Sequence, residues 1–387
     1  MAEHSLIFSA GEYRARLRRL QSSMISAELD VLMLTQPADV FYVTGFLTRF
    51  WESPARPWFV LVPLAGDPVA VIPAIGADLM ARTWMQDIRT WPAPDPRDDG
   101  MSLLRETLEE LLPVVGRVGL PMGLETQLRM PLGDFDQLRR SLATHKFIDA
   151  TEVVQRVREI KSEAEIAKIK SICAIAGRAF DRVPDLAGVG VPLDQVFRQF
   201  QAALLSEGAD WVSYTAGGAG QGGYGDVISP AGQVPLADGD LLMLDTGAVR
   251  DGYFCDFDRN FAIGPASDAL RQGHDVLFAA TEDALTGLRP GMRAHEAHAI
   301  LATGITKRGG APLAGRLGHG LGVTLTEWPS FTPLDQTVLR AGMVLTLEPG
   351  LELAPGRIMV HEENIVLRAE GCELLSPRAP QTLPEIS

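Results

Sequence analysis

The sequence has little cysteine, with three residues in 387, Cys173, Cys255 and Cys372. They are too few and too scattered for a disulfide framework or a thiolate metal site, so the predicted location is a reducing cytoplasm. No apolar run reaches the roughly 18–20 residues of a membrane span, and residues 1–11 lack the features of a signal peptide, so no membrane is expected as a partner. Basic charge is also scarce: 35 Lys and Arg stand against 49 Asp and Glu, which argues against nucleic acid as a partner.

What remains is an ordinary globular composition, 46% hydrophobic and 22% charged, in a chain long enough for two or three domains of about 100–200 residues. Apolar spacing predicts helices and strands in alternation, which indicates an α/β domain with a mixed sheet. Ser162 and Glu165 then form a capping box in front of a helical apolar pattern. We place a domain boundary there and expect domains over residues 1–157 and 158–387. The expected helices are 11–28, 101–112 and 132–142, and the expected strands are 31–34, 58–62 and 69–72.

The second half contains one internal similarity. Residues 239–247, Gly-Asp-Leu-Leu-Met-Leu-Asp-Thr-Gly, and residues 342–350, Gly-Met-Val-Leu-Thr-Leu-Glu-Pro-Gly, share a turn glycine, an apolar run, a carboxylate and a second glycine. Each is followed by a turn and a second apolar segment with another acid. The pattern predicts two hairpins with one carboxylate on each of their four strands. In chain order the acids are Asp245, Asp256, Glu348 and Glu362.

Four acids at the ends of apolar runs would be costly to bury without a cation. Neither run carries Lys or Arg, so a divalent metal is the natural partner, although acids beside glycines can also simply begin turns. Histidine often completes such a site, and only seven are present. His319, between Gly318 and Gly320, is the best-placed candidate, while His295 and His298 lie in a polar stretch that is typical of a solvated helix face.

Five residues in a fixed order carry a family resemblance. Asp-x-Gly at the first acid, Glu-Pro-Gly at the third, and a histidine between them resemble the superfamily of aminopeptidase P, prolidase, methionine aminopeptidase and creatinase. Residues 30–35 and 41–46 resemble the creatinase-type amino-terminal domain, and residues 158–166 resemble the domain join. The resemblance implies an α/β amino-terminal domain followed by a catalytic domain with the pita-bread fold, in which two hairpins are related by a pseudo-twofold axis.

The resemblance also implies a dinuclear centre of Mn²⁺, Fe²⁺, Co²⁺ or Zn²⁺, with ions about 3.5–4 Å apart. Such a pair would lower the pKa of a bridging water and polarise a substrate oxygen. The implied ligands are Asp245 on one ion, Asp256 and Glu362 as bridges, and His319 and Glu348 on the other ion. Glu348 is also a candidate catalytic residue.

The sequence departs from the family's peptidases at three positions. Residues 222–228, which include Tyr224, lack the histidine usual before the first metal strand. Thr326 stands in place of a second histidine, and Val360 in place of an arginine. We predict that Tyr224 and Thr326 contact the substrate, in a site that has lost three groups that hold and protonate a peptide.

Asp258 is an added acid, at a position that is usually threonine in the family. Since side chains alternate along a strand, we expect it to face the same side as Asp256. It is a candidate catalytic base or an anchor for a neighbouring group, or it forms an ion pair with Arg259 at the end of its strand.

The loop after residue 46 contains Trp51 and Arg56. In relatives this loop can reach the partner's catalytic pocket across a dimer interface, so both residues are candidate substrate contacts in a homodimer. Their alternative is a surface loop with one packed tryptophan.

The leading functional hypothesis is a dinuclear-metal hydrolase of the Xaa-Pro peptidase type that acts on a small amide or dipeptide-like molecule. One alternative is a relative of the dimethylsulfoniopropionate lyases, in which an acid such as Asp258 would remove a proton α to a carboxylate. A second alternative is a non-catalytic binding module, against which the five surviving ligands argue.

Overall fold

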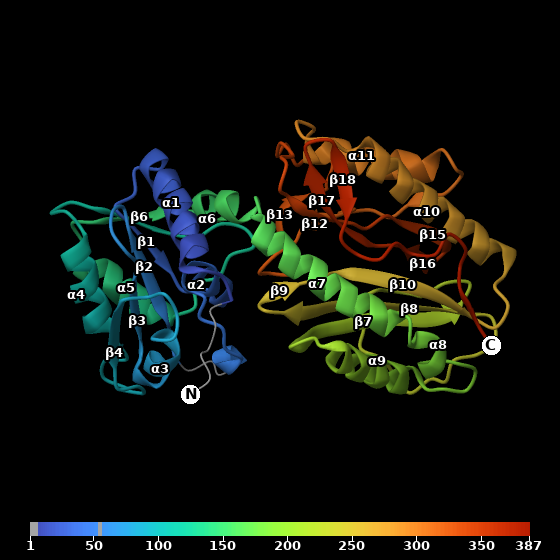
Figure 1. Ribbon diagram of the computed structural model, residues 1–387, viewed down its shortest axis with the longest axis horizontal. Helices are drawn as coiled ribbons and strands as arrows, with labels where there is room; N and C mark the ends of the chain where they lie inside the picture. Colours follow the sequence, from blue (N-terminus) through green and yellow to red (C-terminus); the bar gives the residue numbers. More distant parts are fainter. Residues whose placement is uncertain (1–6, 53–55) are drawn as a thin grey trace. The chain divides into compact units, whose positions relative to one another are not determined.

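The computed structural model describes residues 7–52 and 56–387, and the chain forms two compact units that meet in sequence at Arg158 and Glu159 (Figure 1). The first unit alternates helices and strands, as its sequence predicts. Its elements are α1 (Ala10–Ser26), β1 (Val31–Leu34), α2 (Pro37–Thr44), η1 (Phe50–Glu52), β2 (Phe59–Pro63), β3 (Val69–Pro73), η2 (Ala74–Gly76), α3 (Ala77–Met80), β4 (Asp87–Trp91), α4 (Met101–Leu111), β5 (Arg117–Leu120), α5 (Leu132–Ser141), β6 (Lys146–Asp149) and α6 (Thr151–Arg158).

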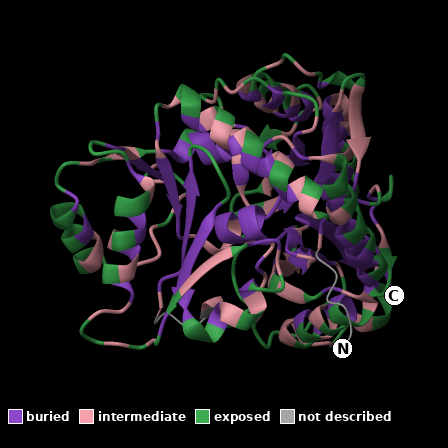
Figure 2. Cartoon of the chain, turned by 60° about the vertical axis from the view of Figure 1, so that its left-hand side comes forward, coloured by how far each residue is buried: buried purple, intermediate pink, exposed green. Residues whose placement is uncertain are grey.

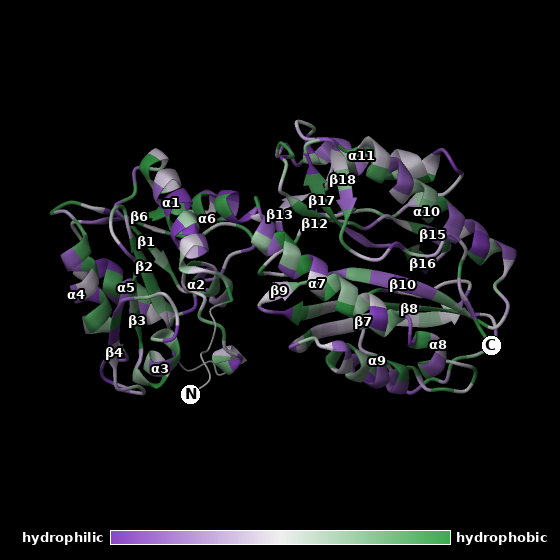
Figure 3. Ribbon diagram, in the orientation of Figure 1, coloured by the Kyte–Doolittle hydropathy of each residue, from purple (hydrophilic) through white to green (hydrophobic). Residues whose placement is uncertain are grey.

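The strands of the first unit form one six-stranded sheet in the order β4-β3-β2-β1-β5-β6. The sheet is mixed, because β2 pairs antiparallel with β1 and β3 while the other neighbours are parallel. Every residue of β1, β2 and β3 is buried, as expected for strands covered on both faces, and Figures 2 and 3 show these strands as buried and largely hydrophobic. The predicted strands and helices of this unit are confirmed to within two residues at each end.

The second unit begins with a long helix. Its elements are α7 (Glu163–Phe180), α8 (Val183–Leu186), α9 (Leu193–Glu207), β7 (Trp211–Gln221), β8 (Asp240–Arg250), β9 (Tyr253–Phe254), β10 (Phe257–Ile263), α10 (Asp268–Gly287), α11 (Ala294–Thr306), β11 (Ala311–Pro312), β12 (His319–Gly320), β13 (Glu327–Ser330), β14 (Val344–Leu347), β15 (Gly350–Ala354), β16 (Arg357–Val360), β17 (Glu363–Arg368), β18 (Gly371–Leu374) and β19 (Glu385–Ile386).

The predicted capping box starts α7. The Ser162 hydroxyl accepts the Glu165 N–H at 3.3 Å, and the Glu165 carboxylate accepts the Ser162 N–H at 3.0 Å. Helices α7 and α9 pack on the sheet β19-β10-β8-β7, in which β9 also pairs with β8. Helix α10 packs on β15 and β18, which belong to the sheets β11-β15-β16 and β13-β12-β14-β17-β18 (Figure 1).

The two repeated segments form the two expected hairpins. The first turns at residues 251–252 and the second at 355–356, and each turn ends in a glycine, Gly252 and Gly356, with φ of 80° and 70°. Glycine adopts this left-handed backbone without the steric cost of a side chain. Both expected hairpins are therefore present, as the pairs β8–β9 and β15–β16.

The expectation of one acid within each hairpin strand is wrong in its detail. Asp245 lies inside β8, but the other three acids lie in breaks: Asp256 between β9 and β10, Glu348 between β14 and β15, and Glu362 between β16 and β17. A side chain in a regular strand must point to one face of its own sheet. The breaks release the chain from the ladder and let the acids of different sheets point to one place.

Candidate metal centre

The five predicted ligands converge in two overlapping groups. Potential ligand atoms of Asp256, His319 and Glu348 all lie within 4.8 Å of one another, and so do those of Asp245, Asp256 and Glu362. Asp256 belongs to both groups. The arrangement offers two adjacent places for a cation, joined by one shared carboxylate.

His319, on β12, is oriented by its own neighbour in sequence. Its Nδ1 lies 2.7 Å from the Gly320 carbonyl, which assigns the proton to Nδ1 and turns Nε2 toward the acids. Nε2 lies 2.8 Å from Glu348 Oε1 and 3.1 Å from Asp256 Oδ2. Burial opposes a charged ring, but the two carboxylates outweigh it and raise the pKa of His319 to about 10. The ring thus presents one nitrogen to a pair of carboxylates.

Asp245 and Glu362 give the strongest indication of a cation site. Burial, followed by repulsion from neighbouring carboxylates, raises the pKa of both groups well above the usual range. Asp245 Oδ1 and Glu362 Oε2 are buried and accept no hydrogen bond from any residue in the described ranges. A buried acceptor left without a partner is costly. The oxygen and imidazole donors present here fit a divalent ion such as Mn²⁺, Fe²⁺, Co²⁺ or Zn²⁺.

Glu348 is held in its charged form. Burial raises its pKa, but the charge of His319 and the hydrogen bond from it outweigh burial and lower the pKa to about 2, with help from Arg316 and from the Thr346 hydroxyl, which donates to Oε1 at 2.7 Å. Arg316 is exposed and immediately precedes Leu317 in the chain. The Leu317 carbonyl accepts the Glu348 N–H at 3.0 Å. Arg316 was not among the residues that the sequence singled out, and it places a cation beside the acid cluster.

Tyr214 is the main residue that sequence reasoning missed. Its hydroxyl lies 2.9 Å from Asp245 Oδ2 and is also hydrogen-bonded to Asp256 Oδ1. Tyr214 lies in a bulge of β7, between Val212 and Thr215, and bulges commonly change the direction of a side chain. A side chain at Gly247 would overlap the Tyr214 ring, so the glycine of the Asp-x-Gly motif was the available signal.

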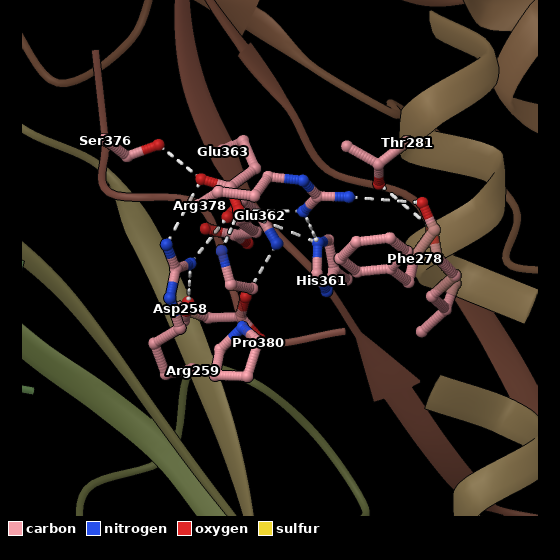
Figure 4. Close-up of polar contacts among 12 residues, drawn as sticks. Asp258, Arg259, Phe278, Thr281, His361, Glu362, Glu363, Ser376, Arg378 and Pro380 are labelled. Atoms are coloured by element: carbon pink, nitrogen blue, oxygen red, sulfur yellow. Dashed lines mark hydrogen bonds and ion pairs between the residues drawn. The ribbon is translucent and has the colours of Figure 1, made fainter. Parts of the chain in front are cut away.

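Asp258 lies directly opposite Asp245 in the β8–β10 ladder, so both face the same side of the sheet. One of its oxygens accepts the Glu362 N–H at 2.6 Å (Figure 4), and the other accepts the Asn260 amide at 2.9 Å. Burial raises the pKa of Asp258 to about 8. Arg259 donates to the Asp258 carbonyl rather than to its carboxylate. The geometry therefore supports the anchor among the three predicted roles, because Asp258 holds the backbone of Glu362.

Glu363, the residue after Glu362, is the centre of a largely buried ionic cluster (Figure 4). Glu363 accepts hydrogen bonds from Arg259 at 3.1 Å and from Arg378 at 2.9 Å. Arg378 also donates to His361 Nε2 at 2.8 Å, so this ring nitrogen carries no proton, and burial lowers the pKa of His361 well below its usual range. The cluster ties the segment before β17 to the carboxyl-terminal part of the chain.

The predicted substrate contacts are less clearly placed. Tyr224 is buried, and its hydroxyl accepts the Val360 N–H at 2.6 Å and lies 3.3 Å from Asn260 Oδ1, so the hydroxyl is already engaged within the protein. Thr326 is half-buried, directly before β13. Histidines 295 and 298 lie on α11, outside both groups of potential ligands.

Trp51 and Arg56 belong to the first unit. The Trp51 ring packs at 5.4 Å from Trp58, and the Arg129 guanidinium lies 5.1 Å from it. Arg129 also donates to the carbonyls of Trp51 and Arg56. Their contact with a partner's substrate stays a prediction.

Comparisons with known families agree with this geometry. The profile described as "Metallopeptidase family M24" matches residues 167–370, more than half of the chain, and the "Creatinase/Prolidase N-terminal domain" matches residues 16–160. The chain belongs to metallopeptidase family M24. It is a hydrolase of that family, with the two-domain organisation of creatinase and prolidase.

M24 relatives match along most of the chain. A Xaa-Pro dipeptidase of Pyrococcus horikoshii is 28% identical over 259 residues, covering 66% of this chain and 72% of its own. The probable dipeptidase PepE of Mycobacterium tuberculosis is 27% identical over 380 residues, 97% of each chain. The crystal structure of dipeptidase PepE from Mycobacterium ulcerans superimposes with a TM-score of 0.84 at 25% identity, covering 98% of this chain and 99% of that one. In the part of the chain that the structure describes, no helix is long and apolar enough to cross a membrane.

Proposed function

We propose that this M24 enzyme is a dinuclear-metal dipeptidase of the Xaa-Pro type that acts on a small dipeptide-like substrate. The observation that carries the proposal is the pair of ligand groups joined through Asp256, in which two buried oxygens have no hydrogen-bond donor from the described residues. Relatives named Xaa-Pro dipeptidase and dipeptidase support the substrate class.

In this proposal each ligand has a defined place. Two divalent ions, when bound, would supply a water of lowered pKa and an electrophile for the scissile carbonyl. Asp245 and Glu362 would hold one ion, His319 and Glu348 would hold the other, and Asp256 is the ligand shared by both groups. Tyr214 and Asp258 keep these side chains in place, the first through the Asp245 and Asp256 oxygens and the second through the Glu362 backbone.

The remaining residues would handle substrate and proton. Glu348, which lies 2.8 Å from His319 Nε2 and accepts the Thr346 hydroxyl at 2.7 Å, is the carboxylate we assign to proton transfer during hydrolysis. Arg316 is exposed beside Glu348 and would bind the carboxylate of a dipeptide. Thr326, and Trp51 and Arg56 from a second copy of the chain, complete the proposed substrate contacts. We therefore expect light scattering to give the mass of a homodimer. The mass of a monomer would exclude Trp51 and Arg56 from the proposed substrate site.

The lyase alternative needs a base that can reach a proton next to a substrate carboxylate. Both oxygens of Asp258 accept hydrogen bonds from the protein, which favours its role as an anchor over that of a base. Hydrolysis therefore fits the geometry better than elimination.

The test is a panel of substrates together with elemental analysis. Purified protein is loaded with Mn²⁺, Fe²⁺, Co²⁺ or Zn²⁺ and assayed with Xaa-Pro dipeptides, with other dipeptides and with dimethylsulfoniopropionate. We expect two metal ions per chain and cleavage of a dipeptide. Release of dimethyl sulfide without peptide cleavage would overturn the proposal in favour of the lyase.

A further inference from the structure

The backbone at Asp256 is bonded by a side chain instead of a strand. Asp256 lies in the break between β9 and β10, and both of its backbone groups are taken up by the amide of Asn364. The Asp256 N–H donates to Asn364 Oδ1 at 3.0 Å, and Asn364 Nδ2 donates to the Asp256 carbonyl. Buried backbone groups need partners, and this amide replaces the two bonds that a ladder would have given.

Asn364 is itself firmly held. It lies on β17, is fully buried, and pairs with Thr346 in the ladder between β14 and β17. Its N–H donates to the Ser376 hydroxyl at 3.0 Å, and its Oδ1 accepts a further contact from the Cys173 thiol at 3.3 Å. The Asn364 amide is therefore fixed by the second hairpin segment, and it hydrogen-bonds the backbone of the first.

Asn364 also follows Glu362 by two residues. Its two hydrogen bonds to the Asp256 backbone therefore connect Asp256 and Glu362, which come from different hairpins. Few other side chains could make both bonds. The amide offers one acceptor and one donor in a fixed plane, whereas aspartate lacks the donor, and leucine, of similar shape, lacks both.

We propose that Asn364 is a positioning residue that sets the place of Asp256 relative to Glu362 and thereby aligns the two halves of the metal centre. The proposal rests on the metal site described under the proposed function. Mutation of a residue that hydrogen-bonds to a metal ligand and orients it typically weakens metal binding about 10–100-fold. Substitution of Asn364 moves Asp256, which belongs to both ligand groups, and affects both ions.

The experiment compares Asn364→Leu with the parent and with Thr281→Ala. Thr281 is a matched control because its hydroxyl is buried and donates to the Leu277 carbonyl within its own helix, α10. In metal-free protein, hydrogen exchange of the Asp256 amide is expected to accelerate at least tenfold in Asn364→Leu and to stay unchanged in Thr281→Ala. Calorimetric titration with Mn²⁺ is expected to give affinities 10–100-fold weaker in Asn364→Leu alone, and the visible spectrum of the Co²⁺ form is expected to shift.

Unchanged exchange at Asp256, or Mn²⁺ affinity within twofold of the parent, would overturn the proposal. If Asn364→Leu does not fold, Asn364→Thr retains a hydroxyl, suits a strand and is judged by the same two measurements. The proposed function can fail separately. A parent that binds two Mn²⁺ but cleaves no dipeptide leaves the positioning role intact, and in a parent that binds no metal the exchange of the Asp256 amide still decides it.

Discussion

The buried ion pair between Lys161 and Glu327 allows a direct test of how burial affects the contribution of an ion pair to the free energy of unfolding. Lys161 Nζ lies 2.9 Å from Glu327 Oε2, and each side chain is only 1% exposed. Lys161→Met retains the length of the side chain and removes the charge. Breaking one partner of a buried pair typically costs about 3–5 kcal/mol. Since Glu327 Oε1 keeps backbone donors at Val323 and Thr324, we expect a loss near 3 kcal/mol in the free energy of unfolding.

The same second unit provides a matched control. Lys170 and Glu373 form a pair at the same 2.9 Å, but their side chains are 58% and 36% exposed. Lys170→Met is expected to cost about 0–1 kcal/mol, as exposed pairs do. Urea unfolding of parent and both variants, followed by circular dichroism, measures the difference. Equal losses in the two variants would refute the argument that burial determines the cost.

Three further predictions concern the metal centre. Asp256→Ala is expected to lose both metal ions, because Asp256 belongs to both ligand groups, and His319→Ala is expected to lose at least one, because His319 belongs to one group. Elemental analysis that finds two ions per chain in either variant would contradict the dinuclear assignment. Removal of metal by a chelator is expected to lower the melting temperature, since a ligand at 100 times its Kd adds about 2.7 kcal/mol to stability, and calorimetry that shows no shift would argue against metal at the buried acids. Arg316→Gln is expected to raise KM for a dipeptide about tenfold, equivalent to about 1.4 kcal/mol, with little change in kcat; the same rise for a dipeptide amide would exclude a contact with the substrate carboxylate.

The elements that the sequence predicts well are those whose stability is local. The helix predicted over 132–142 is observed at Leu132–Ser141, and both hydrogen bonds of the capping box at Ser162 and Glu165 are present. In each case the pattern depends on residues three or four apart, which contact one another on the same helix. The first repeat was equally readable, because an apolar run that ends in an acid before a glycine is a local motif.

The site's supporting contacts could not be predicted in this way. Tyr214, whose hydroxyl contacts Asp245, lies in a bulge of β7, and the amide of Asn364 bonds to a backbone 108 residues earlier in the chain. Alternation along a strand predicts that Asp258 faces the same side as Asp256, but it does not predict that Asp258 pairs with Asp245 in the ladder or that residue 256 lies outside the strand. Register and strand breaks are properties of paired strands, and a single sequence does not contain the partner's alignment.

The breaks nevertheless left a trace in the sequence. The strands β10, β14 and β17 each contain a buried polar residue that bonds to another segment: Asp258, Thr346 and Asn364, respectively. Each bonds to a chain segment that carries a ligand, since Asp258 accepts the Glu362 N–H, Asn364 holds both backbone groups of Asp256, and the Thr346 hydroxyl accepts the His319 N–H at 2.9 Å. A polar side chain inside a core strand is costly unless it is satisfied. A buried polar side chain in a strand close to these acids therefore indicates a bond to a segment that carries a ligand.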